Sequence, residues 1–97
     1  VFQMANNFRI TSHKKNGGLH LKLSGDFDGT SALELLYALH DIIGMAEKIY
    51  IETEGLRSLI PFGRMVFIKN FNFSPSAFKK MVFTGDYGHA LYPSCAD

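Results

Sequence analysis

The sequence predicts an α/β domain in which helices pack on a mixed four-stranded sheet. Three observations lead to this class: a Gly-Gly turn between two alternating segments, a leucine-rich stripe at helical spacing, and further short β-rich segments that alternate with a helical one. Strands that alternate with helices along a chain are typical of parallel βαβ units with right-handed crossovers. A length of 97 residues leaves room for one hydrophobic core, so we expect one domain.

An N-terminal hairpin is the first expected element. Residues 8–12 alternate weakly between apolar and polar side chains, and in residues 19–23 all leucines fall on one face. Between them, residues 15–18 end in two glycines, which adopt the positive φ angles of a tight turn without steric cost. The two segments should therefore pair antiparallel.

The first helix is predicted from a single apolar stripe. Its members recur at helical spacing: Ala32, Leu35, Leu36, Leu39 and Ile43. Ser31, with Glu34 three residues later, fits a capping box, so Ser31 is the expected N-cap. Gly44 is the expected C-cap, because glycine readily adopts the left-handed conformation that often ends a helix.

The second half of the chain continues the alternation. The expected elements are a strand (48–53), a loop (55–61), a helix (62–71), a turn (70–76), a strand (80–84) and a short helical turn (85–91). Pro61 suits the first turn of its helix, where no backbone N–H is needed. The domain should span residues 7–92, between an N-terminal tail (1–6, with a cloning remnant expected before Met4) and a C-terminal tail (93–97).

Composition argues against several classes of function. A net charge of +1 gives no basic footprint for nucleic acid, and the apolar runs are too short to span a membrane. The four histidines have no ligand spacing, so neither a metal site nor a cofactor is expected. Cys95 is the only cysteine and can form no internal disulfide. With no recognisable signal peptide, a cytoplasmic location is expected.

Residues 25–32, with the sequence GDFDGTSA, are the most informative segment, and they allow two interpretations. Asp-x-Asp-Gly-Thr resembles the nucleophile loop of haloacid dehalogenase phosphohydrolases. That resemblance implies Asp26 as nucleophile, Asp28 as general acid/base, a magnesium ion between them, and supporting roles for Thr84 and Asp86. However, Ser24 and Gly25 separate the motif from its hydrophobic strand, and the chain has no room for that family's further βα units. We therefore expect a protein that is not an enzyme.

The second interpretation covers most of the chain. Gly25–Asp28 resembles the Gly-x-Leu-Asp of STAS domains, the fold of anti-sigma factor antagonists, and Thr30–Leu35 resembles the helix entry that follows it. Leu56 and Gly63 match the leucine and glycine that flank that family's Asp-Ser-Ser/Thr segment. The resemblance implies a STAS-like mixed sheet, formed by a hairpin and parallel βαβ units. It also implies a protein-interaction module in bacterial signalling and transcription regulation.

The chain departs from this family at the phosphoacceptor. Ile60, Pro61 and Phe62 occupy the Asp-Ser-Ser positions, and none of them can accept a phosphoryl group. The sequence leaves open whether Ile60 and Phe62 are core or interface. We predict that the segment binds a partner through these residues: Leu59, Ile60, Pro61, Phe62, Gly63 and Arg64. The partner would be an anti-sigma or kinase-like protein, another signalling protein, or a second copy of the chain. A small ligand-binding module is a further alternative, although neither a glycine-rich phosphate cradle nor a basic pocket supports it.

Overall fold

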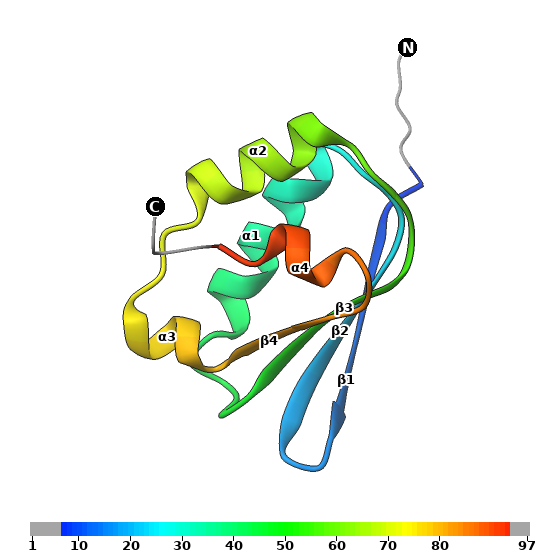
Figure 1. Ribbon diagram of the computed structural model, residues 1–97. Coiled ribbons are helices and arrows are strands. Elements are labelled where there is room, and N and C mark those ends of the chain that lie inside the picture. The colour runs from blue at the N-terminus through cyan, green and yellow to red at the C-terminus, as the bar shows by residue number, and fades with distance from the viewer. Residues whose placement is uncertain (1–6, 94–97) are drawn as a thin grey trace.

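The computed structural model describes residues 7–93 and shows a sheet with helices on one of its faces (Figure 1). The strands are β1 (Arg9–Lys15), β2 (Gly18–Phe27), β3 (Ile49–Leu59) and β4 (Met81–Thr84). The helices are α1 (Gly29–Ile42), α2 (Pro61–Asn70), α3 (Pro75–Lys79) and α4 (Gly88–Leu91). The segments 1–6 and 94–97, and with them the N-terminal tail and Cys95, lie outside the described residues.

The four-stranded sheet has the order β1-β2-β3-β4. β1 pairs antiparallel with β2, and the β2–β3 and β3–β4 pairs are parallel. The predicted hairpin and βαβ unit are therefore confirmed, and so is the α/β class with a mixed sheet. Asn16 and Gly17 form the hairpin turn, both at positive φ (53° and 79°).

The core lies between the sheet and its helices. Alternate residues of β2 and β3 face α1 and α2, because successive side chains of a strand point to opposite faces. The side chains that are completely buried include Phe27, Leu35, Leu39, Ile49, Ile51, Phe67 and Leu91. The predicted leucine stripe of α1 thus faces the sheet. None of the helices within residues 7–93 is long and apolar enough to cross a membrane.

The central strands are longer than predicted. β2 continues to Phe27, and β3 continues to Leu59 through residues that were expected to form a loop. Two shifts in the pairing register, between Lys22 and Ser24 and between Gly25 and Asp26, let the two strands stay paired beyond the glycines. The loop prediction for residues 55–61 was wrong, because strand pairing outweighed the low β-propensity of this segment.

The helix boundaries also correct the sequence prediction. α1 begins at Gly29 with Asp28 as its N-cap, so the capping box built on Ser31 was wrong. The helix ends at Ile42 with Ile43, not Gly44, as its C-cap. α3 was not predicted, because the expected turn (70–76) includes only its first two residues; Ser74 caps this helix by accepting a hydrogen bond from the Ala77 amide (3.1 Å). A serine directly before Pro75 was the available sequence indication of this helix.

Candidate functional site

The two junctions from strand to helix lie side by side. The first is the β2–α1 junction, residues 25–31, and the second is the β3–α2 junction, residues 59–64. β2 and β3 are parallel neighbours, so both reach the same edge of the sheet (Figure 1). Phe27 pairs with Leu59, and the Ile60 amide donates to the Phe27 carbonyl over 2.9 Å. The motif that resembled a catalytic loop therefore touches the predicted partner-binding segment.

In the β2–α1 junction, Asp28 serves its own helix. Its Oδ1 accepts hydrogen bonds from the amide and the hydroxyl of Ser31, each over 2.9 Å. The same hydroxyl also lies 3.0 Å from the main-chain oxygen of Asp26. Ser31 is therefore not the N-cap; it is a completely buried polar residue in the first turn of α1. An N-cap carboxylate satisfies amides that have no partner inside the helix.

Asp26 is held by the end of β3. Its Oδ1 accepts hydrogen bonds from Arg57 Nε (3.0 Å) and Ser58 Oγ (2.7 Å), and its Oδ2 accepts one from Arg57 Nη2. These donors, the guanidinium first, lower the pKa of Asp26 from 3.8 to about 2. The Asp26 carboxylate thus links the end of β2 to the end of β3, where the pairing of the two strands is irregular.

The residues implied by the phosphohydrolase resemblance do not converge. Thr84 pairs with Glu52, whose partner on β2 is Lys22, so Thr84 aligns with a position four residues before Asp26. Its hydroxyl donates to Glu54 Oε1 (3.0 Å), and Asp86 is exposed in the turn after β4. Within residues 7–93 no group of three or more histidine, cysteine or acidic side chains could hold a metal ion.

In the β3–α2 junction, the backbone is rigid and lacks a side-chain cap. Ile60 is the N-cap of α2 but makes no capping hydrogen bond, and Pro61 opens the helix. A Cβ atom on Gly63 would lie 2.6 Å from the Phe27 carbonyl oxygen and 2.7 Å from that of Asp28. Only glycine therefore lets α2 approach the β2–α1 junction this closely, which gives a physical reason for the glycine at position 63.

Large apolar side chains are exposed in this junction and on the two helices that start at the adjacent junctions. Phe62 is 60% exposed and Ile60 39% exposed, so neither side chain is part of the core. The Phe62 ring packs on Gly29, because a Cβ there would lie 2.9 Å from the Phe62 Cε2 atom. Leu33 and Tyr37 follow Gly29 at intervals of four residues, on the same side of α1. We call the exposed set the apolar patch: Leu33, Tyr37, Ile60, Phe62 and Met65.

The predicted binding residues do not all lie in the apolar patch. Leu59 is half-buried and packs against the core, and Gly63 is buried. The Arg64 side chain extends to α4, where its Nε donates to the Ala90 carbonyl over 2.9 Å. Arg64 and Phe62, two residues apart on a helix, point to roughly opposite sides of α2. Arg64 is therefore not placed to form the polar rim that we expected around Phe62.

Sequence reasoning missed Leu33, Tyr37 and Met65. An indication was present, because Leu33 and Tyr37 lie outside the buried stripe of α1 and are nonetheless large and apolar. What the sequence lacked was the position of α2, which packs on α1 and carries the exposed Phe62 and Met65.

No protein-family model matches this chain, and a search of the curated proteins finds no relative. The resemblance to STAS domains therefore stays a prediction that rests on the order of elements and a few matched residues.

Proposed function

We propose that the chain is a non-catalytic protein-interaction module that binds its partner through the apolar patch. The observation that carries the proposal is the exposure of Phe62 (60%) and Tyr37 (68%) on adjacent helices, together with three further exposed apolar side chains. Large apolar side chains that gather on one surface are typical of an interface, whereas isolated ones are common anywhere.

The rigidity of the junction supports binding. Pro61 restricts the backbone next to Ile60 and Phe62, and Gly63 holds the start of α2 against the Phe27 and Asp28 carbonyls. Side chains on a fixed backbone lose little conformational entropy when a partner covers them. An aromatic ring at the centre of a patch is also the usual anchor of a protein interface.

The partner in this proposal is a different protein, an anti-sigma or kinase-like regulator in the bacterial cytoplasm. The order of elements and Gly63 support a STAS-like role, and the apolar centre favours a partner with an apolar surface of its own. Ile60, Pro61 and Phe62 carry no hydroxyl group. Ser58, the residue with a hydroxyl group that lies nearest to them in the sequence, is hydrogen-bonded to Asp26. Binding should therefore not be switched by phosphorylation, in contrast to the antagonists that the chain resembles.

The proposal is tested with Phe62→Asp. The tagged protein is used to recover its partner from the native host, and the purified pair is then studied by titration calorimetry. Because a buried carboxylate has no partner in an apolar interface, Phe62→Asp should weaken binding about 30-fold or more. Met45→Asp is the matched control, since Met45 is 69% exposed and lies beyond the other end of α1. Its affinity should equal that of the wild type.

Two results would contradict the proposal. One is wild-type affinity in both single variants, Phe62→Asp and Met65→Asp. Met65→Asp changes a second residue of the apolar patch and serves as the test if Phe62→Asp fails to fold. The other is self-association of the wild-type chain in sedimentation velocity that Phe62→Asp abolishes, because the patch would then bind a second copy.

A further inference from the structure

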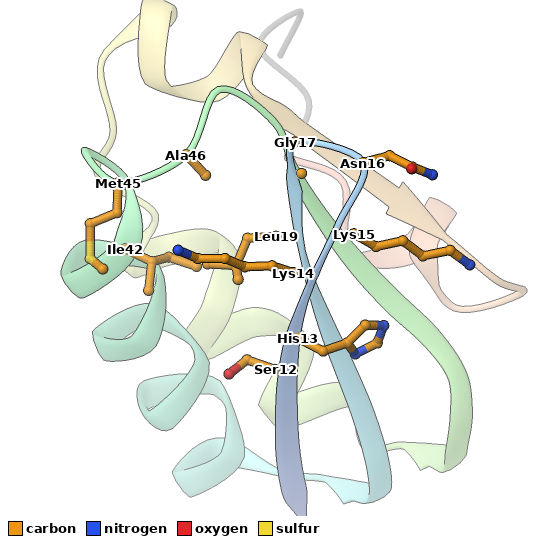
Figure 2. A pocket seen from close by; sticks show the side chains of 11 residues that line it. Ser12, His13, Lys14, Lys15, Asn16, Gly17, Leu19, Ile42, Met45 and Ala46 are labelled. Carbon is orange, nitrogen blue, oxygen red and sulfur yellow. The ribbon is translucent and has the colours of Figure 1, made fainter.

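A second surface feature lies at the opposite end of α1 from the apolar patch. The tip of the β1–β2 hairpin and the segment that follows α1 enclose a groove of about 590 Å³ (Figure 2). We call it the hairpin groove; its lining is formed by Ser12, His13, Lys14, Lys15, Asn16, Gly17, Gly18, Leu19, Ile42, Met45 and Ala46. The volume lies within the usual range for sites that bind small molecules.

The hairpin groove exists because the helices do not cover β1. Ser12 and Lys14 point to the same side as the helices, yet both are exposed. α1 lies beyond them, so an open space remains between the hairpin and the end of this helix (Figure 2). The floor and wall of this space are apolar: Leu19 is buried, Ile42 and Ala46 are half-buried, and Met45 is 69% exposed.

One cationic side chain extends over this apolar floor. Figure 2 shows Lys14 reaching across the groove toward Ile42, whereas Lys15 and His13 point to the other side of the hairpin. Within residues 7–93, the Lys14 side chain forms no hydrogen bond or ion pair, and none of the lining residues is acidic. The negative end of the α1 dipole has another cation, because Lys80 Nζ donates to the Ile43 carbonyl over 2.9 Å.

We propose that the hairpin groove binds an anionic amphiphile, an alkyl chain with a carboxylate head. The chain would lie on Leu19, Ile42 and Met45, where burial of alkyl groups provides most of the affinity. The carboxylate would pair with Lys14, whose ammonium group extends over the groove and makes no ion pair within residues 7–93. This inference concerns free, monomeric carboxylates and does not depend on the proposed partner of the apolar patch.

The test uses dodecanoate below its micelle concentration and follows backbone amide chemical shifts by NMR. Saturable shifts are expected at Leu19, Ile42, Met45 and Ala46, and not around Phe62. Dodecyltrimethylammonium, which has the same chain and the opposite charge, should bind about tenfold more weakly. Butyrate should cause no saturable shift, because its chain buries too little apolar surface.

The adjacent lysines provide a matched pair of variants. Lys14→Glu should weaken dodecanoate binding about tenfold and abolish the preference for the anion. Lys15→Glu makes the same change of charge on the other side of the hairpin, and this variant should bind dodecanoate as tightly as the wild type. Met45→Asp should also weaken binding, and Phe62→Asp should not. Thermal unfolding confirms that each variant is folded.

With dodecanoate, any one of these outcomes would overturn the proposal: no saturable binding, equal losses in Lys14→Glu and Lys15→Glu, or shifts that map to the apolar patch. Binding only to vesicles that contain phosphatidylglycerol would also overturn it, because the ligand would then be a lipid surface rather than a free carboxylate.

Discussion

The two adjacent strand–helix junctions use opposite chemistry. The β2–α1 junction is polar, and its side chains are hydrogen-bonded to the protein itself: Asp28 caps α1, and Asp26 binds Arg57 and Ser58. The β3–α2 junction is apolar, with no capping side chain at Ile60 and with Phe62 exposed to solvent. A polar segment at the end of a strand is often interpreted as a catalytic site, yet here the apolar junction is the one with large side chains exposed to solvent.

This difference shows how the same position in a fold can serve structure or recognition. Groups whose hydrogen bonds are already made inside the protein gain little from a ligand, because the ligand must replace these bonds. Exposed apolar groups make no such internal bonds, and covering them is favourable. The predictions below test this comparison.

The largest effect is expected where the two junctions touch. Gly63→Ala would place a Cβ atom 2.6 Å from the Phe27 carbonyl oxygen, so α2 would have to move away from the β2–α1 junction. Overpacking of this kind should lower the free energy of unfolding by about 2–3 kcal/mol, as measured by urea denaturation. Gly44→Ala is the control, because a Cβ there meets no atom within 4 Å. Equal stability of the two variants would show that the junctions are not in close contact.

A smaller effect is expected from the N-cap. Asp28→Ala removes the acceptor of the Ser31 amide and should cost about 1 kcal/mol of unfolding free energy. Thr30→Ala, a change at an exposed neighbour in the first turn of α1, should cost less than about half of that. Thermal unfolding of both variants provides the comparison. A greater loss in Thr30→Ala would identify Thr30 as the cap.

The third effect depends on pH. Because the pKa of Asp26 is about 2 in the folded protein and 3.8 as its ordinary value, the ionised form stabilises the fold. This contribution is complete above pH 4 or so and is lost as the pH falls toward 2. Asp26→Asn should therefore flatten the loss of stability in that window, and Asp41→Asn, on the exposed side of α1, should not. Parallel acid profiles of Asp26→Asn and the wild type would contradict the ion pair with Arg57.

The smallest expected effect is on catalysis. Asp26 accepts hydrogen bonds from Arg57 and Ser58, and Asp28 accepts them from Ser31. We expect no magnesium-dependent hydrolysis of p-nitrophenyl phosphate by the wild-type chain, and no difference in Asp26→Asn. Hydrolysis that this substitution abolishes would instead support the phosphohydrolase alternative. The polar β2–α1 junction would then be the functional site.

Much of the fold could be predicted from the sequence, and the site only in part. The hairpin, the leucine stripe of α1 and the position of Pro61 are local patterns, and the structure places each as expected. The predicted ends of the elements were less accurate. In β3, the irregular pairing that includes Ser24 and Gly55 extends the strand into residues that were predicted to form a loop. The capping box failed because the helix begins earlier than predicted: Asp28 caps it, and Ser31 is buried in its first turn.

By itself, the sequence determined the α/β class, the order of strands and helices apart from α3, and the absence of a hydroxyl side chain at residues 60–62. These properties depend on residue identity and on periodicity along the chain. The tertiary structure decided that Ile60, Phe62, Leu33 and Tyr37 are exposed, and that Lys14 lies over an open apolar groove. Exposure depends on which distant segment covers a side chain, and this is fixed only when the helices pack on the sheet.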